Sequence, residues 1–364
     1  MGTWAAGGSL STARAEASGA GTKSAGLVVG GVDTSGTALS STEAYNGTSY
    51  SAGGSMSTAR RRQYGCCTSA TACISTTGFN SADSPIGTGV EKYNGTAWSS
   101  AATTTQSGMQ TVAGSSSAGL MFGGFSGGNL STTNTYNGTS WSSTGALGTA
   151  ARNVGGSGSQ TAAIALGGTG NTYSTQLFNG TSWSASGAYP NNSGSSGFGI
   201  SVASGSSNTS AVATGDEGVI TNTSIFSTST WSADTNRTAG IGEAAGYGDS
   251  SNFVSSGGET TASTVSSATT ATYIFSTVAA YTLAIAQGSY SLTGQSVTFT
   301  KALNIVLSTG SYVLTGIAVA LNAVIDIWIR VTKNNSTFTN QSKNDSIFTN
   351  QSKNSSNWTN QNKS

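Results

Sequence analysis

The sequence predicts an all-β fold: a six-bladed β-propeller closed by its N-terminal strand, followed by a small β module and a fibrous repeat tail. Three observations predict it. A Tyr-Asn-Gly-Thr-Ser-Trp phrase returns at a regular spacing, the composition disfavours helices, and two shorter repeats follow near the C-terminus. We expect a propeller over residues 1–277, a β-strand module over 278–332 and an oligomerisation tail over 333–364.

The spacing of this phrase indicates the length of one structural unit. The ring that ends each copy falls at Tyr50, Trp98, Trp141, Trp183 and Trp231. Successive rings are therefore 48, 43, 42 and 48 residues apart, and a period of roughly 40 to 50 residues is typical of propeller blades and helical solenoids. The composition favours blades, because the chain has 51 Gly and only 7% charged residues, whereas long helices need Ala, Leu, Glu and Lys.

Each unit is expected to contain four short strands. In the first unit they are a small-residue stretch after Arg14 and the segments at residues 26–31, 43–45 and 49–50. The Asn-Gly pair before the last strand predicts a two-residue hairpin of type I′, because both residues accept the positive φ that this turn requires. Two Gly at the end of the second strand predict a bend of the backbone there.

The unit resembles the kelch repeat in four features: a Leu or Met with Arg ahead of strand one, two Gly after strand two, an aromatic residue in strand three and Trp in strand four. This resemblance covers about residues 2–277 and implies a β-propeller. The strand-three aromatic falls at Tyr45, Tyr93, Tyr136, Phe178, Phe226 and Phe275, which gives six units. The arginine falls at Arg14, Arg60 or Arg62, Arg152 and Arg237, and two units lack it.

The N-terminus supplies the strand-four ring that is missing after Phe275. Residues 2–10 match residues 48–56 almost position for position, with Trp4 in the place of Tyr50. We therefore expect the N-terminal strand to close the last blade, which removes an open sheet edge. The rings of strands three and four are expected to form the core between blades. The alternative, a row of rings that stacks on carbohydrate, requires them to lie at the surface.

Two further repeats end the chain. A Gly-Ser-Tyr-x-Leu-Thr-Gly segment at residues 288–294 recurs at 310–316, a shift of 22 residues, among alternating apolar residues that are typical of strands. A ten-residue unit then places Phe338, Phe348 and Trp358 on one side of an extended strand, because ten is even. One interpretation is a disordered polar tail. The other is a fibrous segment in which several identical chains, most simply three, bury these rings on a common axis.

Composition disfavours several partners. The net charge is +1, and the only run of basic residues is at 60–62, so the basic stripe of a nucleic-acid-binding protein is missing. The N-terminus has neither the basic flank nor the apolar core of a Sec signal peptide. The most apolar stretch, residues 312–331, contains Asn322 and Asp326, so membrane insertion is not expected.

The chain offers no obvious catalytic or metal-binding set. It has no His, so a Ser nucleophile lacks its usual base, and the His ligands of kelch-type copper oxidases are missing. Cys66, Cys67 and Cys73 make a poor metal site without a fourth ligand. Cys67 and Cys73 could face each other across a hairpin and form a disulfide in an oxidising medium, or simply be buried. We expect a protein that is not an enzyme and needs no cofactor.

The three kinds of repeat together resemble fibre and tail-appendage proteins of tailed bacteriophages. That resemblance implies a structural protein of the virion surface, assembled in the host cytoplasm and attached to the host. The implied partners are further copies of the chain, most simply a homotrimer, other virion proteins, and a host cell-surface glycan or protein. The alternatives are a purely structural capsid or tail decoration and a bacterial surface adhesin, which the missing signal peptide disfavours.

The connections between strands two and three vary most among the units, and varied loops carry function on a repeated scaffold. They are expected to share one face with the arginine segments. The candidate receptor contacts are Phe79, Asp83, Phe125, Asp216, Glu217, Arg14, Arg60 and Arg61. The alternative for each of them is a loop residue that is merely solvated.

Overall fold

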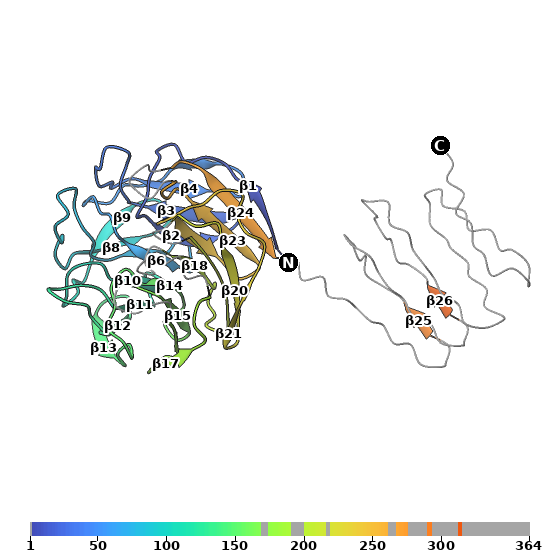
Figure 1. Ribbon diagram of the computed structural model, residues 1–364. Coiled ribbons are helices and arrows are strands. Elements are labelled where there is room, and N and C mark those ends of the chain that lie inside the picture. The colour runs from blue at the N-terminus through green and yellow to red at the C-terminus, as the bar shows by residue number, and fades with distance from the viewer. Residues whose placement is uncertain are drawn as a thin grey trace, which may run out of the picture. The chain divides into compact units, whose positions relative to one another are not determined.

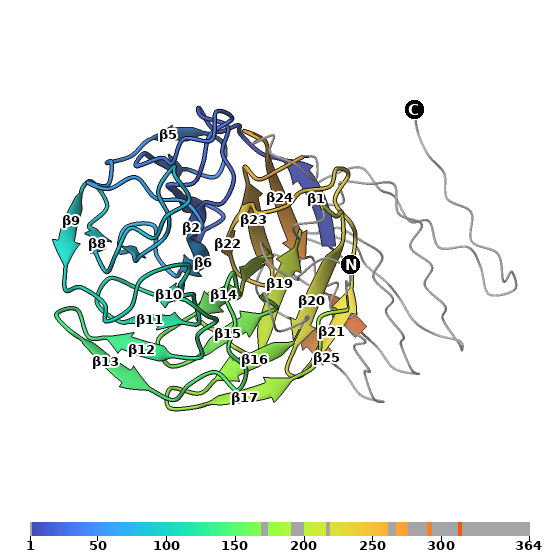
Figure 2. The same ribbon diagram turned by 60° about the vertical axis from the view of Figure 1, so that its left-hand side comes forward.

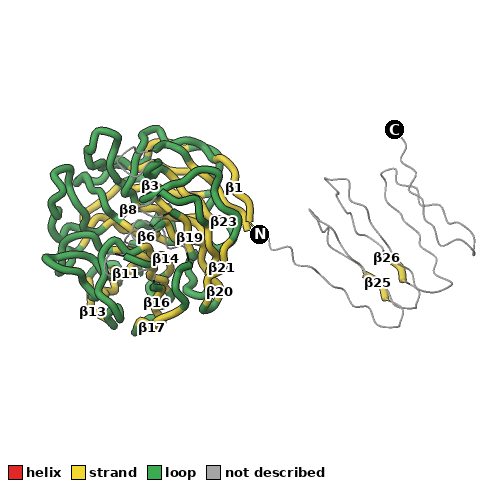
Figure 3. Tube along the Cα trace, in the orientation of Figure 1, coloured by secondary structure: helices red, strands yellow, loops and turns green. Residues whose placement is uncertain are grey.

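The computed structural model describes residues 2–168, 174–190, 200–215, 219–260, 267–275, 290–292 and 312–314. The chain divides into two compact units, Met1–Ser276 and Thr277–Ser364. The first unit is all-β, and its strands group into six blades around a central axis, five of which are continuous four-stranded ladders (Figures 1 and 2). The predicted six-bladed propeller is confirmed, and strands joined by loops make up its described part (Figure 3).

Each blade runs from an innermost strand at the axis to an outermost strand at the rim (Figure 2). Blade 1 comprises β2 (Ser18–Thr22), β3 (Ala25–Val29), β4 (Thr42–Tyr45) and β5 (Tyr50–Ala52). Blade 2 comprises β6 (Tyr64–Cys67), β7 (Ile74–Ser75), β8 (Val90–Tyr93) and β9 (Trp98–Ala101). Blade 3 comprises β10 (Thr111–Gly114), β11 (Gly119–Phe122), β12 (Thr133–Tyr136) and β13 (Trp141–Thr144).

The remaining three blades follow the same plan. Blade 4 comprises β14 (Gly155–Gly158), β15 (Ala163–Leu166), β16 (Thr175–Phe178) and β17 (Trp183–Ser186). Blade 5 comprises β18 (Ser201–Ala203), β19 (Ser210–Thr214), β20 (Thr223–Ser227) and β21 (Thr230–Ala233). Blade 6 comprises β22 (Ala245–Gly248), β23 (Asn252–Ser256), β24 (Thr270–Phe275) and, as its outermost strand, β1 (Gly2–Ala6).

Small residues let the innermost strands approach one another at the axis. β6 pairs in parallel with both β2 and β10. A Cβ added to Gly19 would lie 2.3 Å from the carbonyl oxygen of Gly246 in blade 6, so a larger side chain would push these strands apart. The centre is therefore packed, and the cavity that Gly156, Ser201 and Gly246 help to line holds only about 10 Å³.

The N-terminal strand closes the ring as predicted, because β1 pairs antiparallel with β24. The register places Trp4 opposite Tyr273 and Gly2 opposite Phe275. The sixth strand-three ring is therefore Tyr273, which is fully buried, and the assignment of Phe275 to this position was wrong. β24 continues for two residues beyond Tyr273 without a turn. Phe275, the last aromatic residue of this strand, was therefore mistaken for the repeated ring.

The two recurrent rings play different parts in the core. The described strand-three rings are buried, as predicted, whereas the strand-four rings are half-buried and cover the core edge. The indole N–H of Trp183 donates to Thr133 Oγ1 of the preceding blade at 2.9 Å, and Trp231 and Trp4 make the same bond at 2.8 and 3.0 Å. These bonds tie blades 4, 5 and 6 to the blade before each of them.

The Asn-Gly phrase folds differently from the prediction. In the copy after β12, Tyr136 pairs with Trp141, so the connection has four residues rather than two. Asn137 Oδ1 accepts the backbone N–H groups of Thr139 at 3.0 Å and Ser140 at 2.8 Å. Of the loop residues only Gly138 has a positive φ, 93°. The asparagine side chain, rather than a type I′ backbone, closes the loop.

The described part of the second unit consists of two short strands. β25 (Tyr290–Leu292) and β26 (Tyr312–Leu314) pair in parallel, with Tyr290 beside Tyr312. This register equals the 22-residue shift of the sequence repeat. The remainder of the expected module and the tail with Phe338, Phe348 and Trp358 lie outside the described residues. No helix in the described part of the chain is long and apolar enough to cross a membrane.

Candidate binding site on the loop face

The strand order gives the propeller two chemically different faces. The loop face carries the connections between strands two and three and those that lead from strand four to the next blade. The turn face carries the tight turns between strands one and two and between strands three and four. Its turns repeat one design: Asn46, Asn94, Asn137 and Asn179 each accept two backbone N–H groups within their own loop.

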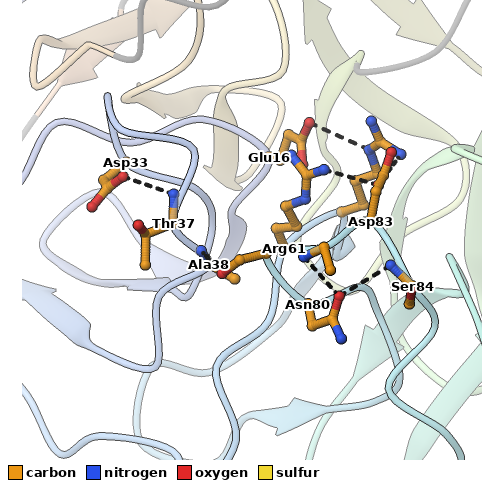
Figure 4. A network of polar contacts seen from close by, with 11 residues as sticks. Glu16, Asp33, Thr37, Ala38, Arg61, Asn80, Asp83 and Ser84 are labelled. Atoms are coloured by element: carbon orange, nitrogen blue, oxygen red, sulfur yellow. Dashed lines mark hydrogen bonds and ion pairs between the residues drawn. The ribbon is translucent and has the colours of Figure 1, made fainter.

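On the loop face, the long loops of blades 1 and 2 have the same backbone conformation. Asp33 Oδ1 accepts the N–H groups of Ser35 and Thr37, both at 2.9 Å. Asn80 Oδ1 likewise accepts the N–H groups of Ala82 at 2.9 Å and Ser84 at 3.1 Å (Figure 4). The Ser35 hydroxyl and the backbone N–H groups of Thr37 and Ser35 hold the pKa of Asp33 below its ordinary value. The two loops therefore form a preorganised pair of equal shape.

The two loops differ at one conformationally demanding position. The residue in the left-handed region is Gly36 in blade 1, with φ of 81°, and Asp83 in blade 2, with φ of 58°. The N–H of each donates to the carbonyl three residues earlier, Asp33 or Asn80, at 3.1 Å. Glycine suits this region better than any residue with a Cβ. Blade 2 thus holds an aspartate where the backbone prefers glycine.

Asp83 completes a cluster of four charged side chains, which we call the charged cluster: Glu16, Arg61, Arg62 and Asp83. Arg61 Nη2 lies 2.9 Å and Arg62 Nη1 2.7 Å from Asp83 Oδ1. On the inner side, Arg62 Nε lies 3.3 Å from Glu16 Oε1, and Arg61 Nη1 lies 3.6 Å from Glu16 Oε2 (Figure 4). The side chain of Asp83 is 50% exposed, whereas that of Glu16 is 6% exposed.

The inner half of the charged cluster belongs to a collar around the axis. Glu16, Arg62, Asn153 and Glu243 each stand two residues before an innermost strand, β2, β6, β14 or β22, and all have a φ between 50° and 57°. The N–H of Glu16 donates to the carbonyl of Glu243 at 2.9 Å, which joins blades 1 and 6. Burial raises the pKa of Glu16, although Arg62 and Arg61 oppose this effect. Backbone strain gathered at one place is a feature of functional sites.

Arg14 and Arg60 do not belong to this surface, which corrects their prediction as receptor contacts. They are only 1% and 2% exposed. Arg14 Nη2 lies 2.7 Å from Glu43 Oε1, and Arg60 Nη2 lies 2.9 Å from Glu91 Oε1. Each glutamate also accepts backbone N–H groups of the segment ahead of the arginine, from Ser11, Thr12, Ser57 and Thr58. These pairs are scaffold beneath the loop face.

The prediction that the repeated arginines occupy one equivalent position is also partly wrong. Ala151, not Arg152, makes the backbone hydrogen bond that corresponds to that of Arg60. The N–H of Arg237 donates to Thr221 O, as that of Leu10 does to Ala268 O, so Arg237 occupies a position that is apolar in blade 1. Its side chain is 8% exposed and lies 5.0 Å from the centre of the Trp4 ring. In the described part of the chain its Nε and Nη1 atoms have no hydrogen-bond partner.

The remaining predicted receptor contacts are Phe79, Phe125, Asp216 and Glu217. Phe79 is buried, with Arg62 5.8 Å from its ring centre, so it supports the charged cluster from below. Phe125 is half-exposed, and Arg152 lies 4.7 Å from its ring centre. This pair offers a cation and an apolar surface on the loop face of blade 3. Asp216 and Glu217 lie outside the described residues.

Sequence reasoning missed Glu16, and it treated Arg62 and Arg152 as members of the arginine repeat without naming them as receptor contacts. One signal could have found the first two. Glu16 stands twelve residues after Trp4, and Arg62 stands twelve residues after Tyr50. An alignment on the strand-four rings, which are fixed by the core, places these residues at the same height of neighbouring blades. An alignment on the arginines themselves does not.

The turn face has a groove of its own, between blades 2 and 3. It measures about 550 Å³ and is lined mainly by hydroxyl and amide side chains, among them Thr71, Asn94, Ser99 and Ser117. Lys92, its one charged lining residue, points its Nζ at the carbonyl of Gly138 at 3.4 Å. The groove lacks the opposed charges that mark the loop face.

Comparisons with known proteins bear on the fold alone. No family model and no curated protein matches the sequence. The solved structure of YjhT is similar, with a TM-score of 0.57 and 12% sequence identity. The match covers 95% of YjhT and 72% of this chain. It supports the propeller fold and leaves more than a quarter of this chain without a counterpart.

Proposed function

We propose that this protein is a non-enzymatic virion-surface protein of the fibre or tail-appendage kind, and that its kelch-like propeller attaches to the host surface through the loop face. The single observation that carries the binding proposal is Asp83. An exposed carboxylate in a backbone conformation that favours glycine, held by two arginines, is a costly arrangement that the scaffold does not need, since Gly36 builds the same loop in blade 1.

The chemistry of the loop face suits a polar receptor. Arg61 and Arg62 present guanidinium donors and Asp83 presents an acceptor, while Phe125 adds an apolar surface beside Arg152. Donors and acceptors fixed in advance bind hydroxyl-rich or amide-rich groups at a low entropic cost. The proposed partner is a host cell-surface glycan or protein.

The C-terminal part has a separate role in this proposal. The ten-residue repeat with Phe338, Phe348 and Trp358 would bring identical chains together, most simply as a trimer, and would dock the propeller on other virion proteins. An oligomer multiplies weak loop-face contacts, because each further site binds at a high effective concentration. Native mass measurement of the full chain tests this role, and a monomer would contradict it.

The binding proposal is tested with the labelled full chain on a panel of bacterial strains and on polysaccharides released from them. We expect saturable binding to some strains, and competition by the released polysaccharide or by protease-treated envelope material. As a matched control, Thr139→Ala changes an exposed residue of the turn face and should leave binding unchanged. Absence of saturable binding to any strain, together with binding to purified virions, would favour a purely structural decoration instead.

A further inference from the structure

Blade 2 differs from the other blades at its innermost hairpin. In blades 1, 3, 4, 5 and 6 the first two strands form an antiparallel ladder. In blade 2, β6 pairs with β2 and β10, and β7 pairs with β8, but among the described residues no ladder joins β6 to β7. The ladder of backbone hydrogen bonds that joins the first two strands of the other blades is therefore missing between β6 and β7 in the described residues.

Two cysteine sulfurs occupy the gap. Cys67 ends β6 and Cys73 precedes β7, and each is 1% exposed. Their Sγ atoms are 2.6 Å apart, about 0.6 Å more than the roughly 2.0 Å of a disulfide bond. The N–H of Ile74 donates to Cys67 Sγ at 3.4 Å, a contact in which sulfur stands in for the missing backbone acceptor.

The backbone on both sides of the sulfur pair is held in place. The carbonyl of Cys73 accepts the N–H of Tyr93 in β8 at 2.8 Å. Cys67 lies beside Gly114 of β10 in the parallel register, and the next N–H, of Thr68, donates to the Gly114 carbonyl at 2.8 Å. The sulfurs are thus brought together by the fold and not by a mobile loop.

We propose that Cys67 and Cys73 form a disulfide that staples the first two strands of blade 2 when the protein meets an oxidising medium. A low-molecular-weight disulfide is the oxidant. One thiolate attacks it and forms a mixed disulfide, with release of one small thiol. The second cysteine thiolate then displaces the other small thiol. Two protons leave the cysteines, and two electrons reduce the oxidant to two thiols.

Access decides when this reaction occurs. Both sulfurs are buried, whereas the turn between them contains the exposed Thr71. Opening of this turn admits the oxidant, and closing of the hairpin brings the mixed disulfide against the second sulfur. The site is independent of what the loop face binds, because it lies at the turn-face end of the blade. A reducing cytoplasm keeps the cysteines as thiols, and an extracellular medium favours the bond.

The test uses the full chain prepared under reducing conditions and three variants, Cys66→Ser, Cys67→Ser and Cys73→Ser. Each is exposed to oxidised glutathione, blocked with N-ethylmaleimide and weighed intact. We expect oxidised Cys66→Ser to weigh about 2 Da less than its reduced, unblocked form, for two hydrogen atoms, and to leave Cys67 and Cys73 unblocked. The wild type should show the same deficit of about 2 Da together with one N-ethylmaleimide group on Cys66. Cys67→Ser and Cys73→Ser should show no such loss.

Thermal unfolding supplies the second measurement, because a cross-link within the native hairpin constrains the unfolded chain. Oxidised Cys66→Ser should melt at a higher temperature than its reduced form, and the two forms of Cys73→Ser should melt together. The proposal is overturned by loss of 2 Da in Cys67→Ser or Cys73→Ser, which would place the bond on Cys66. It is equally overturned if Cys66→Ser stays reduced, or if its oxidised form melts no higher than its reduced form.

Discussion

The loop face and the turn face are built from the same repeats, yet they have diverged to different degrees. On the turn face, four copies of one asparagine close their loops with the same pair of hydrogen bonds. On the loop face, neighbouring blades carry different residues at equivalent positions, such as Gly36 and Asp83. This difference indicates that the repeated residues maintain a scaffold, and that the candidate site lies where equivalent positions carry different residues.

The same contrast holds beneath the loop face. Blades 1 and 2 bury an arginine and glutamate pair at this height, with Arg14 on Glu43 and Arg60 on Glu91. In blade 3, Asn134 takes the place of the glutamate, and in blade 4 Gln176 does. The charged cluster thus stands above the only described blades that contain such a pair.

The largest expected effect comes from breaking one of these pairs. Arg14→Leu leaves the buried carboxylate of Glu43 without its charged partner, and removal of one member of a buried pair costs about 3–5 kcal/mol. Urea unfolding of the wild type and the variant measures the loss. The double variant Arg14→Leu with Glu43→Leu should recover much of it, and a double variant as unstable as the single one would contradict the pairing argument.

A smaller effect of opposite sign is expected at Arg237. This buried guanidinium has no acidic partner among the described residues and leaves two of its nitrogen atoms unbonded. Arg237→Leu restores the residue type that blade 1 has at Leu10, and relief of a buried unsatisfied charged group should raise the free energy of unfolding by about 1–3 kcal/mol. A loss of stability would mean that the contact with Trp4 outweighs the cost of burial.

On the turn face, Asn137→Ala should cost about 1 kcal/mol, because two backbone N–H groups lose their acceptor in a partly solvated loop. Asn94→Ala and Asn179→Ala should cost similar amounts, since the loops are alike. Equal values measured by urea unfolding would sharpen the comparison of the faces. Clearly unequal losses of stability would contradict the inference that these loops are equivalent parts of one scaffold.

The smallest effect is a pH dependence from the collar. Because burial raises the pKa of Glu16, the folded protein binds a proton more tightly than the unfolded chain, whose Glu pKa is about 4.3. This residue therefore favours folding at low pH, and its contribution falls as the pH rises from that value through the folded pKa. Glu16→Gln should remove this downward component from the curve of unfolding free energy against pH. An unchanged curve would show that Arg61 and Arg62 fully offset the burial.

Much of the scaffold could be predicted from the sequence, because the core repeats its rings at fixed intervals. Trp4 identifies the closing strand from its place in the repeat, since a half-repeat at one end needs the other end to complete it. The loop of Asn137 was predicted as a turn but of the wrong type, because the side chain rather than the backbone supplies the acceptor. The error at Phe275 arose where the chain has no turn to fix the register.

The candidate site was harder to predict, because its contacts join residues far apart in the chain. Glu16, ahead of blade 1, meets Arg62, ahead of blade 2, and only Arg62 falls in a sequence pattern, as one of two candidates for the repeated arginine. The sequence marks Asp83 only as a varied loop residue, whereas its left-handed backbone is visible only in the structure. Arg14 and Arg60 look like surface residues in a chain so poor in charge, and their burial depends on glutamates 29 and 31 residues away.

The most direct test of the binding role of the loop face is equilibrium binding of the wild type and Asp83→Gly to the same receptor-bearing cells. Glycine fits the left-handed backbone, as Gly36 shows in the sister loop, so the variant should unfold at the same urea concentration as the wild type or a higher one. We predict that it nevertheless binds at least about tenfold more weakly, equivalent to about 1.4 kcal/mol. Unchanged binding by a stably folded Asp83→Gly would contradict the assignment of the charged cluster as the receptor site.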